Sequence, residues 1–337
     1  MKKIGIVLLW LIFGSNAFAQ FKVIRKIPLP GEGFWDYLTV DSLYNRLFLS
    51  HGTVVQVVNM KSGELLHTIE GTSGVHGITL AYDLNKGYTS NGRDSSVTVF
   101  NLKTLEVMGK VKINGANPDA ILYDVFSHKT FVFNGRSHNA TVLDAKTDKE
   151  LTNIELDGKP EFAVTDGQGN IFVNVEDKSL IARIDASTLK VTAQWPLAPG
   201  EEPSGLAIDK KDMFLYSVCD NKTMVVTDIS SGKVISNLPI GERVDGVAYS
   251  PSLGKAFSSN GEGTVTVVQK ENKNKFKVVQ TVSTQQGART IALDPRTNHL
   301  FLPTAEFGAP GPATKENPKP RPSIKPGSFV VLELAPE

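Results

Sequence analysis

The sequence predicts an all-β fold, a seven-bladed β-propeller whose N-terminal strand closes the last blade. A unit of about 42 residues recurs seven times along the chain, which is the signature of a repeat architecture. Short alternating segments rich in Val, Thr and aromatic residues are separated by turns that contain Gly, Asn or Asp, as expected for β-strands. No stretch shows a sustained 3.6-residue apolar period, so essentially no helix is expected.

The repeat is defined by the residue that opens the first strand of each unit. These residues are Asp36, His76, Asp119, Glu161, Ser204, Asp245 and Arg289, separated by 40, 43, 42, 43, 41 and 44 positions. A second strand with an aromatic residue follows, as at 48–52 and 131–135, then a third alternating strand, as at 54–58 and 140–143. A fourth strand completes the unit, and four-stranded repeats of this length are typical of propellers. The alternative, a β-sandwich with an extra domain, does not explain the regular spacing.

The last unit contains three evident strands, at 291–293, 299–302 and 328–334. Residues 21–27 alternate in the same way and supply the missing fourth strand by pairing with 329–334. Such a strand closes the ring and covers two sheet edges that would otherwise be open to other chains. Residues 20–337 are therefore expected to form one propeller domain.

The first 19 residues have the features of a secretory signal peptide. Lys2 and Lys3 precede an apolar run at 4–13, and Ala17-Phe18-Ala19 fits the small-residue rule for cleavage after Ala19. The apolar run is too short for a comfortable membrane span, although a retained anchor is the alternative. We expect a periplasmic or secreted protein with no membrane span in the mature chain.

Composition excludes several classes of function. The 36 Lys and Arg residues nearly balance the 35 Asp and Glu residues, so the chain lacks the basic excess of a nucleic-acid binder. The single Cys219 excludes an internal disulfide, a Cys-based zinc site and an iron–sulfur cluster. No phosphate-binding loop, dinucleotide fingerprint or zinc-protease motif occurs. No cofactor is required by these observations, and a binding role is favoured over an enzymatic one, which stays open.

One repeat resembles a known family. Phe131-Val132-Phe133-Asn134-Gly135, followed by Ala-Thr-Val-Leu-Asp at 140–144, resembles the YVTN repeat of YncE-like propellers, and 172–174 with 184–185 is a weaker copy. The resemblance covers the whole mature chain and implies an extracytoplasmic seven-bladed propeller. One branch of that family is reported to bind single-stranded DNA. Its basic surface is not evident here, so that activity is not transferred.

The candidate site follows from propeller geometry. The innermost strands all begin on one face, and the loops between second and third strands reach the same face. The strand openers should therefore surround one mouth of the channel, with a second ring at His51, Asn91, Asn134, Val175, Cys219, Asn260 and Thr304, and Trp35 as an aromatic wall. The candidate ligand-binding residues are Trp35, Asp36, His51, His76, Arg93, Asp119, Arg136, Glu161, Asp245, Glu262, Arg289 and Glu306.

These residue types indicate two chemistries. Arg93 and Arg136 both follow an Asn-Gly turn and could grip a carboxylate or phosphate, which predicts a small polar or anionic ligand, with a protein partner as the other option. A divalent cation, Ca²⁺ or Mg²⁺, could be held by carboxylates and an imidazole. The residues of that set are Asp36, His76, Asp119, Glu161 and Asp245.

The metal set leads to an alternative function, a metal-assisted hydrolase or lyase of the lactonase type. If the acids are crowded and unpaired, at least one should have a raised pKa. The simpler interpretation is that Asn and Asp residues form turns and the acids pair with Arg289. In that case the protein could be a purely structural interaction module.

A Pro-rich segment at 305–327 interrupts the last unit between its second and third strands. It contains six prolines and four basic residues. Loops of this length are usually functional or disordered, and proline favours an extended backbone. We expect a lid or a partner-binding strap on the mouth face, or else a loop that packs on the rim.

Overall fold

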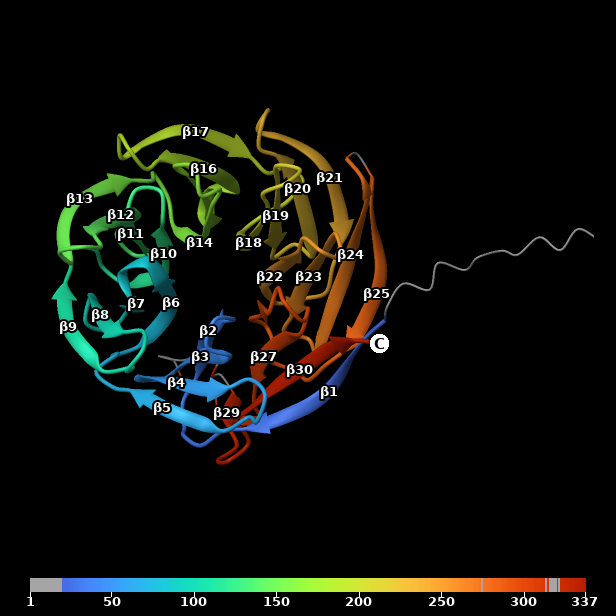
Figure 1. Cartoon of the computed structure of the whole chain (residues 1–337). Coiled ribbons are helices and arrows are strands. Elements are labelled where there is room, and N and C mark those ends of the chain that lie inside the picture. The colour runs from blue at the N-terminus through green and yellow to red at the C-terminus, as the bar shows by residue number, and fades with distance from the viewer. Residues whose placement is uncertain (1–19, 274, 313, 315–319, 321) are drawn as a thin grey trace, which may run out of the picture.

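The computed structural model describes residues 20–273, 275–312, 314, 320 and 322–337. In this part of the chain seven four-stranded antiparallel sheets are arranged around a central axis (Figure 1). The predicted seven-bladed β-propeller is confirmed. The signal peptide predicted at 1–19 lies outside the described residues and stays a prediction.

The first six blades each consist of four strands that follow one another in the chain. Blade 1 contains β2 (Trp35–Asp41), β3 (Arg46–His51), β4 (Val54–Asn59) and β5 (Leu65–Ile69). Blade 2 contains β6 (Val75–Ala81), β7 (Lys86–Asn91), β8 (Ser96–Asn101) and β9 (Val107–Lys112). Blade 3 contains β10 (Pro118–Asp124), β11 (Lys129–Asn134), β12 (Asn139–Asp144) and β13 (Lys149–Glu155).

The next three blades repeat this order. Blade 4 contains β14 (Pro160–Thr165), β15 (Asn170–Val175), β16 (Leu180–Asp185) and β17 (Lys190–Pro196). Blade 5 contains β18 (Pro203–Asp209), β19 (Phe214–Cys219), β20 (Thr223–Asp228) and β21 (Lys233–Pro239). Blade 6 contains β22 (Val244–Ser250), β23 (Lys255–Asn260), β24 (Thr264–Asn272) and β25 (Lys275–Ser283). Helix is limited, in the described residues, to the 3₁₀ turns η1 (Tyr82–Leu84) and η2 (Glu176–Lys178).

Blade 7 joins the two ends of the described chain. Its order from the channel outwards is β26 (Ala292–Leu293), β27 (Leu300–Thr304), β30 (Val330–Pro336) and β1 (Phe21–Pro28). β1 pairs antiparallel with β30, from Phe21 opposite Pro336 to Pro28 opposite Val330. The blue and red strands therefore lie side by side in Figure 1. The predicted closure by the N-terminal strand is confirmed.

The Pro-rich segment carries a small ladder of its own. Within the insertion, β28 (Phe307–Pro310) pairs antiparallel with β29 (Pro322–Ile324). Both arms are extended, as expected for a Pro-rich segment, and they also pair with each other, which the sequence did not predict. Residues 313, 315–319 and 321 lie outside the described part.

The apolar core is divided among the interfaces between blades. Seven clusters of buried side chains occur in the described chain, and each joins two neighbouring blades. Phe131 and Phe133 of blade 3 contact Ile171 and Val173 of blade 4, for example. A propeller blade buries its aromatic second strand only against a neighbour, so each blade requires the next one and the ring must close.

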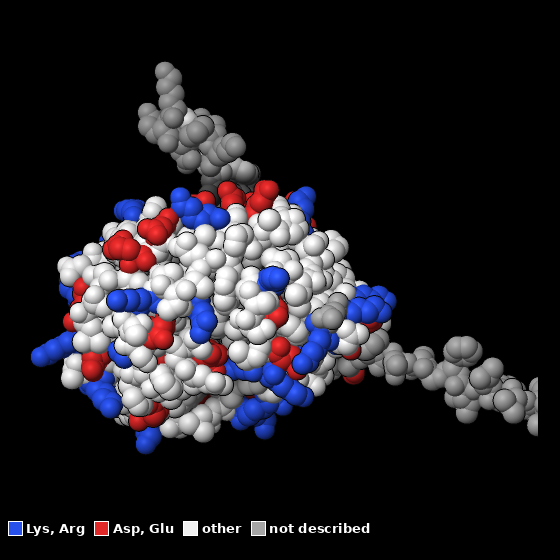
Figure 2. All heavy atoms as spheres, turned by 90° about the horizontal axis from the view of Figure 1, so that it is seen from above, with Lys and Arg blue, Asp and Glu red and all other residues white. Residues whose placement is uncertain are grey.

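The outer surface carries both charge signs. On the side of the ring shown in Figure 2, Lys and Arg side chains are interspersed with Asp and Glu. In the described part of the chain, no helix has the length and apolar character needed to cross a bilayer.

Candidate functional site

The strand openers lie at one mouth of the channel because of a repeated backbone irregularity. In each of the first six blades the innermost strand has a β-bulge at its start, as between Trp35 and Leu38 in β2. A bulge removes one residue from the pairing register and redirects its side chain. The redirected residues are the openers Asp36, His76, Asp119, Glu161, Ser204 and Asp245.

Serine hydroxyls on the second strands support these bulges. Ser50 Oγ accepts a hydrogen bond from the Asp36 amide at 3.0 Å and donates one to the Tyr37 carbonyl oxygen at 3.0 Å. Ser90 accepts from the Gly77 amide at 2.9 Å and donates to the Asp119 carbonyl oxygen. In blades 1 and 2 a serine hydroxyl therefore bonds to backbone groups beside the opener, which helps to fix the direction of its side chain.

All seven openers line one cavity of about 370 Å³, here called the acid basin. Its other lining residues are Tyr37, Lys159, Glu176, Glu202, Asp220 and Val244. Sequence reasoning missed Tyr37, Lys159 and Glu176. Lys159 could have been found, since it lies only two positions before Glu161. Tyr37 could not, because its orientation depends on the bulge.

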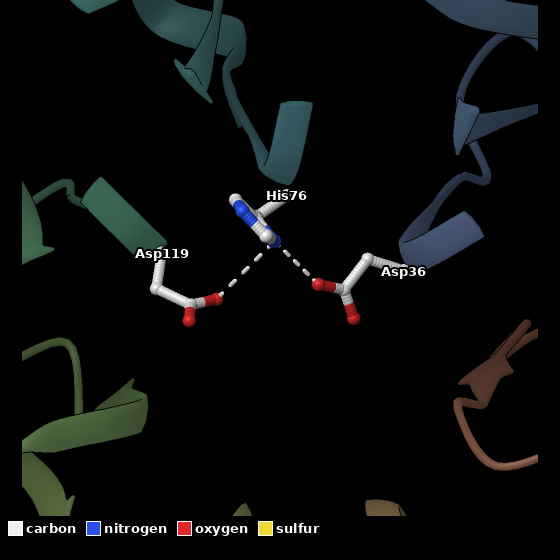
Figure 3. Close-up of side chains that lie close together, drawn as sticks. All are labelled: Asp36, His76 and Asp119. Atoms are coloured by element: carbon white, nitrogen blue, oxygen red, sulfur yellow. Dashed lines mark hydrogen bonds and ion pairs between the residues drawn. The ribbon is translucent and has the colours of Figure 1, made fainter. Parts of the chain in front are cut away.

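A network of ion pairs runs around the basin. His76 Nδ1 lies 2.6 Å from Asp36 Oδ2 and 3.8 Å from Asp119 Oδ1, so the imidazole bridges blades 1 and 3 (Figure 3). Arg289 pairs with Asp245, and its guanidinium is 3.7 Å from Asp36. The predicted pairing of the acids with Arg289 is therefore observed for two of the four acids.

Lys159 forms an ion pair with Glu161, the opener of blade 4. Its Nζ lies 2.6 Å from Glu161 Oε1 and also contacts Glu176. Burial lowers the pKa of the Lys159 ammonium, but its hydrogen bonds to Glu161 and Glu176 outweigh that effect and raise it. Lys159 is therefore a fixed positive charge at the edge of the basin.

Crowding raises the pKa of three carboxyl groups. Burial, followed by the charge of Asp36, raises the pKa of Asp119 to about 6. Burial also raises the pKa of Asp245 to about 7, although Arg289 opposes the shift. Burial and the charge of Asp119 raise the pKa of Glu161 to about 8. The expected raised acid pKa is thus present, and the basin favours groups that bring positive charge.

His76 is cationic near neutral pH. Burial lowers the pKa of its imidazole, but the hydrogen bond to Asp36 and the charge of Asp119 more than compensate and raise it to about 9. Asp36, His76 and Asp119 each offer one ligand atom within 4.8 Å of the others. Glu161 and Asp245 of the predicted five-residue metal set are engaged instead by Lys159 and Arg289. A divalent cation at this place stays a prediction, and it would have to displace the imidazole proton.

An aromatic pair crosses the channel beneath the basin. The rings of Tyr37 in blade 1 and Phe162 in blade 4 meet edge to face, with centroids 5.1 Å apart. Gly77, Gly205 and Gly246 occupy the same offset in three other blades. A Cβ at Gly205 would lie 2.9 Å from the Asp245 carbonyl oxygen. Small residues let the inner strands approach closely, and two large rings fill the space that remains.

A second cavity of about 500 Å³ adjoins the first. It is lined by Arg93 and Arg136 and shares Asp36, His76 and Arg289 with the acid basin. Both arginine side chains are exposed. In the described residues neither makes a side-chain ion pair, and the nearby acid Asp94 pairs with Lys110 at 3.0 Å instead. We call this cavity the arginine cavity.

The second ring is structural. Its members are fully or almost fully buried: His51, Asn91, Asn134, Val175, Cys219, Asn260 and Thr304. Asn134 Nδ2 donates to Asn139 Oδ1 and Thr141 Oγ1, both at 2.9 Å. Asn91 and Asn260 make the same bonds to their own third strands. The three asparagines of this ring are therefore held within their own hairpins, and their side-chain amides are not free for a ligand at the mouth.

The remaining candidates lie apart from the basin. His51 is buried, its Nδ1 is 3.2 Å from Gln56 Oε1, and its ring stacks on Phe329 with centroids 4.0 Å apart. Trp35 lines the arginine cavity but packs mainly against Phe307 and Phe329.

Two acids on the mouth loops have local roles. Glu262 accepts hydrogen bonds from the Glu242 amide at 3.0 Å and from Thr264 Oγ1 at 2.8 Å. Glu306 pairs with Lys325 at 3.0 Å. Neither acid is among the residues that line the acid basin or the arginine cavity.

No protein-family model matches the chain, and no curated protein matches it significantly. The chain is a seven-bladed propeller with a polar basin at one mouth of its channel. That architecture fits a binding or interaction module.

Proposed function

We propose that this chain is an exported binding protein of the YVTN-propeller type that holds a small polar ligand at the mouth of its channel. The observation that carries the proposal is a basin walled by charges of both signs and by Tyr37, whose ring meets that of Phe162 across the channel. A concave site with convergent polar groups is the usual form of a small-molecule site. The interspersed charges of the outer surface (Figure 2) favour a small ligand over nucleic acid.

In this proposal the arginine cavity binds the anionic group of the ligand. Arg93 follows Gly92, where a Cβ would lie 2.7 Å from His76 Nε2, so this turn packs directly on the imidazole. The Arg136 turn is fixed by its amide, which donates to the Ala116 carbonyl oxygen at 3.2 Å. Two guanidinium groups on anchored turns of neighbouring blades suit a carboxylate.

The test combines native mass spectrometry with ligand-induced thermal shifts. Protein purified from the periplasm is examined for a bound small molecule, and the apo protein is melted with butyrate, butylamine and 4-aminobutyrate. We expect at least one carboxylate probe to raise the melting temperature. Arg93→Ala and Arg136→Ala should each weaken its binding about tenfold to a hundredfold, since charge-assisted hydrogen bonds contribute about 1.5–3 kcal/mol.

The matched control is Arg296→Ala. Arg296 is also exposed and lies in the turn between β26 and β27, where it approaches Asp294 at 3.5 Å. Its loss should leave probe binding unchanged. The proposal fails if no probe shifts the melting temperature and no small molecule is found, or if the arginine variants bind like the parent.

A further inference from the structure

The acid basin has an excess of negative charge that its own cations do not balance. Seven of its lining residues are acids: Asp36, Asp119, Glu161, Glu176, Glu202, Asp220 and Asp245. Three are cations, His76, Lys159 and Arg289, and each is already paired with an acid. Protonation of carboxyls relieves part of this charge, and a bound cation would relieve the rest.

Among the four acids that open inner strands, Asp119 has the most distant cation. Its closest cation among the described residues is His76, at 3.8 Å, whereas Asp36, Glu161 and Asp245 each make a direct hydrogen-bonded pair. The Asp119 side chain is only 16% exposed. A carboxylate this enclosed is expected to have a close donor, and none is supplied by the described chain.

Tyr37 is an independent sign of a missing partner. The residue is 8% exposed and lines the basin. No hydrogen bond of its hydroxyl group is found among the described residues, and the oxygen is not one of the fully buried unpartnered atoms, so it is accessible to a ligand in the basin. Burial raises the pKa of this phenol, and the charge of Asp119 is the largest of the carboxylate contributions that raise it further. The side chains of Tyr37 and Asp119 line the same cavity.

Positively charged side chains without ion-pair partners among the described residues lie in the adjoining arginine cavity. Arg93 and Arg136 line the arginine cavity without ion pairs in the described part of the chain, and both cavities include Asp36, His76 and Arg289 in their walls. One continuous surface thus offers unpaired guanidinium groups at one end and an under-partnered acid with a phenol at the other. A ligand that satisfies both ends must carry both charges.

We propose that the ligand is a zwitterion with an ammonium group at Asp119 and Tyr37 and a carboxylate at Arg93 and Arg136, as in an amino acid or the end of a short peptide. This inference rests on the proposed binding function and specifies its ligand class. The ammonium donates to the Asp119 carboxylate and the Tyr37 oxygen, and the guanidinium groups donate to the carboxylate. His76 lies between the two ends and links them through Asp36.

The experiment compares three probes of matched length by calorimetric titration. 4-Aminobutyrate carries both charges, butyrate only the carboxylate, and butylamine only the ammonium. We expect 4-aminobutyrate to bind at least tenfold more tightly than either single-charge probe. Tyr37→Phe keeps the ring that closes the channel, so it should weaken 4-aminobutyrate and butylamine about fivefold to tenfold and leave butyrate unchanged.

A second variant, Asp119→Asn, also tests the site proposed for the ammonium group. It should weaken the two amine-bearing probes more than tenfold and spare butyrate, whereas Arg136→Ala should weaken the two carboxylate-bearing probes. Equal binding of butyrate and 4-aminobutyrate, with no effect of Tyr37→Phe, would overturn the zwitterion while leaving the proposed binding function intact. Absence of binding for all three probes would overturn the zwitterion, and it would also overturn the binding function if native mass spectrometry finds no small molecule.

Discussion

Replacing Asp119 by asparagine should make the protein more stable at pH 7 and leave its stability unchanged near pH 3.5. The pKa of Asp119 is raised from 3.8 to about 6 by burial and by the charge of Asp36. The folded state therefore holds a proton on this carboxyl that the unfolded state releases between these two pH values. Stability falls as the pH rises through that window, because the unfolded state binds fewer protons there.

The size of the stability difference follows from the pKa shift of Asp119. About two pKa units correspond to about 3 kcal/mol of lost stability above pH 6. Asparagine has nearly the same shape and no charge, so Asp119→Asn should not show this loss. The free energy of unfolding, measured by urea titration and tryptophan fluorescence from pH 3.5 to 8, should separate the two proteins progressively above pH 4.

Asp94→Asn provides a control in which the pKa shift, and with it the pH dependence of stability, has the opposite sign. Burial opposes the shift, but hydrogen bonds from Ser96 and Lys110 lower the pKa of the Asp94 carboxyl. Its stabilising contribution is present above the unfolded pKa and is lost as the pH falls. Since Asp94 is 37% exposed, the variant should lose at most about 1 kcal/mol at pH 7. A difference between Asp119→Asn and the parent that is constant over the whole pH range would refute the reasoning.

Two further predictions concern stability. Deleting residues 20–28 removes β1, exposes the edge of β30 and removes Phe21 from its contact with Phe257. The loss should approach the whole stability of a typical domain, about 5–15 kcal/mol, and a deletion variant that melts like the parent would disprove closure by this strand. Asn134→Ala removes a buried amide that bonds twice to β12. It should cost about 1–3 kcal/mol in a denaturant titration, and an unchanged midpoint would show that these bonds are dispensable.

The repeat spacing and strand alternation determined the fold, the number of blades and the closing strand. These features are local: each blade carries its own turn residues and alternating strands, so seven similar segments predict seven similar sheets. The same spacing also identified equivalent residues. Six of the strand openers lie at equivalent bulges, and all seven line one cavity. The spacing could not show the bulges themselves, because strand register depends on the pairing between strands.

Only the tertiary structure decided which polar residues share a site. Asn91, Asn134 and Asn260 were expected at the mouth of the channel, but their side chains bond across their own hairpins. Tyr37 and Phe162 lie 125 positions apart and meet only because blades 1 and 4 face each other across the channel. The pairing of charges around the basin likewise depends on distances between blades, and no local pattern in the sequence encodes those distances.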